Sequence, residues 1–257
     1  DPTGVPLVLL HGFGPEGNFT WTRILPLLES ERSLIMPELL GMGFSERVLD
    51  PTDAYTHQGR SRDLAELLDQ LEIEQVDLVG ASYGGGVSAQ FALDYPERVR
   101  RLVFLDAQVF GTGGGFFEAL GNLPWGIGRA MTWFALGMGP VSQQMLTGGC
   151  ADSGFCPTEG EMAERNGRAS VIGTVDALRA MSETAVSTRL PHDLPQITQP
   201  TLVIWGENDN IIPPEQGRQL ADTIPNAQLE MISDAGHSPH MDQPEITAHK
   251  LISFLNQ

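Results

Sequence analysis

The chain has 257 residues, of which 41% are hydrophobic and 19% are charged. These values are typical of a globular protein rather than a disordered one, and the length suits one domain with an inserted subdomain. The net charge of −18 disfavours binding to nucleic acids and anionic membranes, and no apolar run is long enough for stable insertion into a bilayer.

The first part of the chain predicts strands that alternate with helices. Apolar runs predict buried strands at residues 5–10, 33–36, 76–79 and 101–106, and helical spacing predicts helices at residues 21–28, 56–71 and 87–93. This alternation is typical of a parallel sheet with helices on both faces. We therefore predict an α/β core whose first part is residues 1–108.

The alternation stops after the fourth predicted strand. Residues 109–149 contain only two charged side chains, and glycines and prolines divide this apolar stretch into short predicted helices. We predict a helical cap over residues 109–196, with Phe110, Trp125 and Trp133 roofing an apolar pocket. The alternative, that these aromatic side chains fill the cap's own core, stays open.

The α/β pattern returns in residues 197–257, which we predict to be the second part of the core. Apolar runs predict strands at residues 200–205 and 228–232, and helical spacing predicts helices at residues 215–224 and 244–255. Short polar loops that contain Asp209 and His237 follow these two strands.

A sharp turn between a predicted strand and a predicted helix carries the pattern Gly80-x-Ser82-x-Gly84. A strand that turns at once into a helix holds the corner residue in a strained conformation, and the flanking glycines allow close packing there. The Ser82 hydroxyl is therefore expected at the carboxyl edge of the sheet, beside the positive end of the helix dipole.

A serine hydroxyl becomes a useful nucleophile when a base accepts its proton and an acid orients that base. The chain offers Ser82, Asp209 and His237 in this order, each after a predicted strand. We therefore predict these three residues to be catalytic. Asp106, which also ends a strand, is an alternative acid, and His240 is an alternative base.

These motifs resemble those of the α/β-hydrolase superfamily over essentially the whole chain. The matching stretches are residues 11–14, 80–85 and 205–209 and the pair at 236–237. The resemblance implies a mostly parallel hydrolase sheet, an inserted cap and an oxyanion hole made by the backbone N–H groups of Phe13 and Tyr83. The family normally has two further strands before the first one here, which predicts that the usual first strands are missing.

The same resemblance predicts roles for other residues near the nucleophile. Gly12, Gly14 and Ile211 are expected to line the substrate pocket. His11 is expected to hydrogen-bond the backbone of its own loop rather than to act as a base. The mechanism requires no cofactor and no metal.

We predict a serine carboxylesterase that acts on a small-molecule ester. A fainter similarity to chlorophyll dephytylase-like esterases, in residues 40–45, 121–124 and 237–240, suggests a long apolar acyl or alcohol part. Two alternatives stay open: a hydrolase that cleaves a carbon–carbon bond in ring-fission products with the same triad, and a non-catalytic receptor for a small ligand.

The two cysteines, Cys150 and Cys156, lie in one glycine-rich stretch. A disulfide between them would indicate an oxidising compartment and so a secreted protein, whereas two free thiols would fit the cytoplasm. The sequence shows no signal peptide and predicts a soluble protein, and it leaves the compartment and the oligomeric state open.

Overall fold

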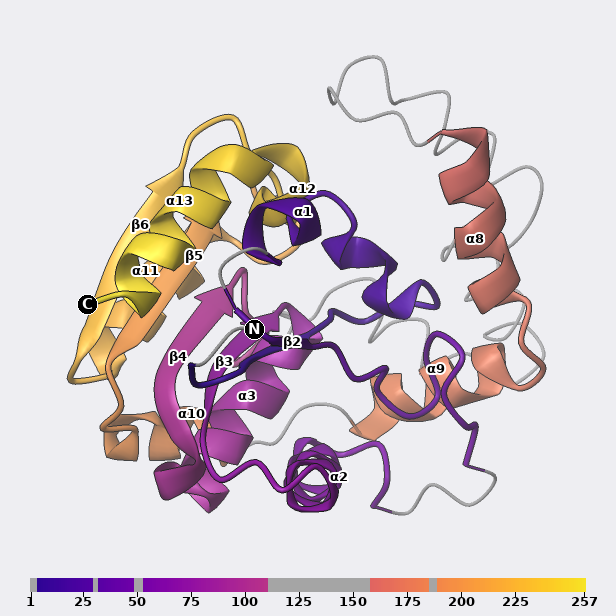
Figure 1. Ribbon diagram of the computed structural model, residues 1–257, viewed down its shortest axis with the longest axis horizontal. Helices are drawn as coiled ribbons and strands as arrows, with labels where there is room; N and C mark the ends of the chain where they lie inside the picture. The colour runs from indigo at the N-terminus through magenta and orange to yellow at the C-terminus, as the bar shows by residue number, and fades with distance from the viewer. Residues whose placement is uncertain (1–3, 30–31, 49–52, 111–157, 185–188) are drawn as a thin grey trace.

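A parallel sheet forms the centre of the molecule in the computed structural model, which describes residues 4–29, 32–48, 53–110, 158–184 and 189–257 (Figure 1). Within these residues the sheet has six strands in the order β2-β1-β3-β4-β5-β6, and every neighbouring pair is parallel. The strands are β1 (Leu7–Leu10), β2 (Leu34–Ile35), β3 (Val76–Ala81), β4 (Val99–Leu105), β5 (Thr201–Gly206) and β6 (Ala227–Ile232). The predicted α/β fold with a mostly parallel sheet is therefore confirmed.

Helices cover both faces of this sheet. The buried residues of α2 (His57–Gln70), α3 (Tyr83–Asp94) and α11 (Pro214–Thr223) belong to one hydrophobic cluster, and those of α1 (Leu25–Leu28) and α13 (Pro244–Leu255) belong to the other. The two clusters take alternate residues of β1, since Val8 and Leu10 pack in the first and Leu7 and Leu9 in the second. A strand covered on both faces is apolar throughout, as residues 5–10 predict.

Local sequence signals account for several helix boundaries. The Thr56 side chain accepts a hydrogen bond from the Gly59 N–H at 3.0 Å and so caps α2 at its N-terminus. The helix predicted at residues 21–28 is instead divided into η1 (Gly17–Trp21) and the short α1, with Pro26 in the first turn of α1. The remaining elements near the sheet are η2 (Pro96–Arg98) and α12 (Pro239–Asp242).

The segment between β4 and β5 is helical where the structure describes it. It contains α8 (Glu159–Ala169), α9 (Thr174–Thr184), α10 (Leu190–Asp193) and η3 (Leu194–Gln196), and α8 and α9 lie on the opposite side of the view from β5 and β6 (Figure 1). The predicted boundaries of the core and cap at 108, 109, 196 and 197 stay a prediction. A search of the described residues finds no helix with the length and apolar character of a membrane span.

The strand register brings the loops that follow β3, β4, β5 and β6 to one edge of the sheet. Ala81 pairs with Leu105, Leu105 with Ile204, and Gly206 with Ile232. Parallel strands that end at matched positions release their following loops side by side. Residues far apart in the sequence therefore meet at this carboxyl edge.

Candidate active site

Ser82 occupies the turn between β3 and α3 with a positive φ of 49° and a ψ of −116°. Its backbone is held on both sides, because its N–H donates to Leu105 O at 2.9 Å and its carbonyl accepts from Gln108 N–H at 2.8 Å. A Cβ on Gly84 would overlap the carbonyl oxygens of Leu10 and His11, so only glycine allows α3 to start this close to β1. The turn is thus strained and fixed by its surroundings.

The Ser82 hydroxyl is hydrogen-bonded to His237, which in turn is hydrogen-bonded to Asp209. The distance from Ser82 Oγ to His237 Nε2 is 2.9 Å, and that from His237 Nδ1 to Asp209 Oδ2 is 2.8 Å. Since the Asp209 carboxylate can only accept, Nδ1 carries the ring proton and Nε2 presents a lone pair to the serine. The structure therefore brings together the three residues that we predicted to be catalytic.

Asp209 is ionised in a buried position. Its Oδ1 accepts the backbone N–H groups of Ile211 and Ile212 at 2.8 and 2.9 Å, and its side chain is inaccessible to solvent. Burial alone would raise the pKa of Asp209, but the hydrogen bond and charge of His237 and these two N–H donors lower it below its ordinary value. The carboxylate is therefore available to orient the imidazole and to stabilise its cation.

Asp106, the alternative acid, does not bond to Nδ1 of His237, which is bonded to Asp209. Its Oδ1 accepts the Gly206 N–H at 2.9 Å. Asp106, Asp209 and His237 each place one potential ligand atom within 4.8 Å of the other two, which is close enough for a metal ion. Because Nδ1 of His237 is already bonded to Asp209, the arrangement fits a proton-transfer site better than a cation site.

The loop that follows β1 lies directly against the nucleophile. A Cβ built on Gly12 would stand 3.2 Å from Ser82 Cβ, so the loop passes beside the serine at the position predicted for the oxyanion hole. The Tyr83 N–H belongs to the first turn of α3, where no earlier helical residue accepts it. The rings of Phe13 and Tyr83 also pack edge to face, with centroids 6.4 Å apart and planes inclined by 68°. Both predicted oxyanion donors therefore belong to segments that adjoin Ser82.

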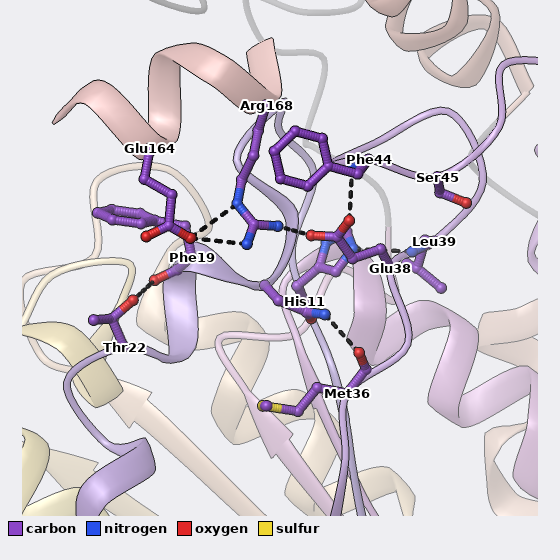
Figure 2. Close-up of polar contacts among 12 residues, drawn as sticks. His11, Phe19, Thr22, Met36, Glu38, Leu39, Phe44, Ser45, Glu164 and Arg168 are labelled. Carbon is purple, nitrogen blue, oxygen red and sulfur yellow. Dashed lines mark hydrogen bonds and ion pairs between the residues drawn. The ribbon is translucent and has the colours of Figure 1, made fainter. Parts of the chain in front are cut away.

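His11 braces this loop, in agreement with the structural role predicted for it. Its Nε2 accepts the Leu39 N–H at 3.1 Å (Figure 2). Nδ1 therefore carries the proton and donates to Gly12 O at 2.8 Å. Complete burial lowers the pKa of His11 to about 4. The neutral ring therefore ties the loop of Gly12 to the loop that follows β2.

His240, the alternative base, is buried away from the nucleophile. Its Nε2 bonds to Thr20 Oγ1 at 2.8 Å, and its ring lies 4.7 Å from the ring of Trp21. Burial and the neighbouring His237 lower the pKa of His240 to about 3, so the ring is neutral at physiological pH. His240 therefore holds α12 against η1, and His237 alone of the two bonds to Ser82.

The residues predicted to line the pocket fall into two groups. Gly14 donates its N–H to Met42 Sδ at 3.4 Å, Phe110 is half-buried against the core, and Ile211 is exposed while its N–H binds Asp209. Trp125 and Trp133 lie outside the described residues, as do Cys150 and Cys156 of the predicted disulfide. Their predicted roles stay predictions.

A charged contact joins α8 to the loop that follows β2, and the sequence alone does not predict it. Arg168 of α8 forms ion pairs with Glu38 and with Glu164, and its guanidinium lies 4.8 Å from the ring centre of Phe44 (Figure 2). Glu38 also accepts the Phe44 N–H at 2.6 Å. Glu164 and Arg168 have the helical spacing of an ion pair, but no local signal predicts the partner 130 positions earlier.

This nucleophile turn and the order of serine, acid and histidine belong to one class of protein. The sequence pattern of the alpha/beta hydrolase fold family matches residues 5–244, and the chain belongs to that family. The predicted membership of the α/β-hydrolase superfamily is therefore confirmed.

Several named relatives match nearly the full chain. A 2-hydroxymuconate semialdehyde hydrolase from a Pseudomonas species is 35% identical and the match covers 98% of this chain and 87% of the relative. A 2-hydroxy-6-oxo-2,4-heptadienoate hydrolase from Pseudomonas putida is 31% identical, with 93% and 85% covered. Among solved structures, a thermophilic esterase from Thermogutta terrifontis has a TM-score of 0.77 at 30% identity, with 99% and 90% covered. The chain is therefore a hydrolase whose relatives act on different bonds.

Proposed function

We propose that the protein is a serine hydrolase that cleaves carboxylic esters through an acyl-enzyme. One observation carries this proposal: the continuous hydrogen-bonded array from Ser82 Oγ through His237 to Asp209, with bonds of 2.9 and 2.8 Å. Such an array activates a hydroxyl that is otherwise a poor nucleophile at neutral pH. The structural similarity to an esterase at 30% identity adds support for ester substrates.

In the first half of the reaction, Ser82 Oγ attacks the ester carbonyl while His237 Nε2 takes the hydroxyl proton. The negative charge that develops on the carbonyl oxygen is stabilised by the Phe13 and Tyr83 N–H groups, and one such donor contributes roughly 3 kcal/mol to the transition state. Asp209 stabilises the imidazolium. His237 then returns the proton to the departing alcohol, which leaves the acyl group on Ser82.

In the second half, His237 takes a proton from a water molecule, and the resulting hydroxide attacks the acyl carbonyl. The same N–H groups stabilise the second oxyanion. The carboxylic acid departs as Ser82 Oγ regains its proton from His237. These steps use only side chains and backbone groups of this chain, together with water.

Carbon–carbon bond hydrolysis is the second candidate, favoured by the two Pseudomonas hydrolases at 35% and 31% identity. Here Ser82 would attack a ketone carbonyl of a ring-fission product, and the leaving carbon would take the proton. The esterase of similar structure at 30% identity is the observation that favours ester cleavage over this second candidate. A receptor without activity is disfavoured by the hydrolase family membership.

A substrate panel tests the proposal. We expect the purified protein to hydrolyse p-nitrophenyl esters of graded acyl length, and to do so with a higher kcat/KM than a 2-hydroxy-6-oxo-dienoate. We expect Ser82→Ala to lose at least about 10⁵-fold in kcat/KM with an unchanged melting temperature. Undiminished hydrolysis by this variant would reject the mechanism, and a preference for the dienoate would favour the second candidate.

A further inference from the structure

Asp106 is a second buried carboxyl group close to Asp209, the acid of the triad. It follows β4 directly, has a positive φ of 44° and is fully buried. One of its carboxyl oxygens lies within 4.8 Å of a carboxylate oxygen of Asp209 and of a ring nitrogen of His237. The proposed mechanism does not use this residue, and a buried carboxyl group this close to a second one requires an explanation.

The hydrogen bonds of Asp209 leave one acceptor position open. An ionised carboxylate has about four lone-pair sites. Three are filled, by the N–H groups of Ile211 and Ile212 on Oδ1 and by His237 Nδ1–H on Oδ2. The side chain is inaccessible to bulk solvent, so the fourth site needs a donor from inside the protein. A donor on the neighbouring Asp106 is suitably placed to fill it.

The hydrogen bonds of Asp106 are fewer. Oδ1 accepts the Gly206 N–H at 2.9 Å, while Oδ2 is buried and has no N–H or O–H donor from another described residue. A buried negative charge on Oδ2 would be unsolvated and would face the charge of Asp209. Because Asp209 has three N–H donors and Asp106 has one, a single proton shared by the pair belongs on Asp106.

We propose that Asp106 is a positioning residue that stays a neutral carboxylic acid and donates its O–H to the Asp209 carboxylate. This inference rests on the proposed role of Asp209 in the triad. The bond fixes the Asp209 carboxylate with Oδ2 toward His237. It also draws charge from Asp209, so that His237 is a weaker base than it would be beside an isolated carboxylate.

The charges around Asp106 support a neutral acid. Burial is the largest influence and raises the pKa of Asp106 well above its ordinary value, and the Gly206 N–H only partly opposes it. The charges of Asp209, in the loop after β5, and of Asp242, in α12, raise that pKa further, as does the hydrogen bond to Asp209. His237, after β6, is the remaining titratable group of the cluster.

Two substitutions separate this role from simple packing. Asparagine at position 106 keeps an oxygen for the Gly206 N–H and an N–H for Asp209, so it imitates the neutral acid. Leucine has a similar shape, excludes water and cannot donate. Asn tolerates a positive φ well, while Leu does so less readily. The rate at which a fluorophosphonate labels Ser82, measured against pH, reports the activated serine without reference to a natural substrate.

We expect the fluorophosphonate to label Asp106→Asn within about threefold of the wild-type rate. The acidic limb of the curve of labelling rate against pH should keep the same apparent pKa. We expect Asp106→Leu to label about tenfold more slowly and to show a higher apparent pKa, because an Asp209 without its donor stabilises the imidazolium more. An unshifted apparent pKa in Asp106→Leu, or equal shifts in both variants, would overturn the proposal.

An infrared measurement tests the proton directly and does not depend on activity. At pH 7 the wild-type spectrum minus that of Asp106→Asn should contain the C=O stretching band of a protonated carboxylic acid. Absence of this band would overturn the proposal even if Asp106→Leu fails to fold. A wild-type protein whose Ser82 is not labelled would contradict the proposed function instead, so the two failures are distinguishable.

Discussion

The carboxyl edge of the sheet and the contact between α8 and the core are held together by different kinds of interaction. At the edge, backbone groups fix Ser82, since Leu105 and Gln108 bond its main chain, and two N–H groups hold Asp209. At α8, long side chains make the contact: Arg168 pairs with Glu38, and Arg165 approaches Glu16 at 3.9 Å.

The difference has a physical consequence. Backbone groups at the ends of paired strands have little freedom, so they can hold reacting atoms to within tenths of an ångström. Arginine side chains have several rotatable bonds, and their ion pairs tolerate changes in geometry. We therefore expect substitutions at the edge to act on the reaction rate, and substitutions at the α8 contact to act weakly and on stability.

After Ser82→Ala, which removes the nucleophile, the largest expected effect comes from Asp209→Asn. The amide leaves the shape unchanged but no longer stabilises the His237 tautomer that accepts the serine proton, so we expect kcat/KM to fall about 10⁴-fold. Steady-state kinetics with a p-nitrophenyl ester measures it, and Glu207→Gln, at an exposed position nearby, serves as the matched control. Activity within tenfold of the wild type would show that the edge does not depend on this carboxylate.

An intermediate effect is expected from pH, through three buried neutral histidines. Burial lowers the pKa of His11 and of His57 to about 4 and that of His240 to about 3, all from 6.5. The unfolded chain therefore binds more protons below pH 6.5, so the free energy of unfolding rises with pH in this window and is lost as pH falls. A shift from 6.5 to 4 corresponds to roughly 3 kcal/mol.

Urea denaturation at graded pH measures this dependence. We expect the free energy of unfolding to decrease steadily from pH 7 toward pH 4, and the decrease to be smaller in His57→Gln. His249 is exposed, so His249→Gln is the matched control and should keep the wild-type slope. Equal slopes in all three proteins would show that His57 is not held neutral by burial.

The smallest effect is expected at the α8 contact. Lysine cannot bridge two carboxylates as the planar guanidinium does, nor stack as well on Phe44, so Arg168→Lys should lower the free energy of unfolding by about 1 kcal/mol. Arg189, whose side chain is 86% exposed, provides the control substitution Arg189→Lys, with no expected change. A loss of kcat in Arg168→Lys as large as that of Asp209→Asn would remove the distinction between the two regions.

The sequence by itself determined the sheet, the nucleophile turn and the set of candidate residues. Apolar runs, helical spacing and the glycines around Ser82 are local patterns, and local patterns follow from backbone sterics and from burial on one or two faces. The same reasoning placed Asp106 and Asp209 each after a strand. It predicted Asp209 as the catalytic acid and kept Asp106 as an alternative.

Only the tertiary structure decided which side chains touch. It placed Asp209 on Nδ1 of His237 with Asp106 close by, and it turned His240 toward Thr20. It also joined Arg168 to Glu38 across 130 positions of sequence. These contacts depend on how loops and helices that are far apart in the sequence pack together. The periodicity of a sequence reports local structure only, so it does not predict which distant residues come into contact.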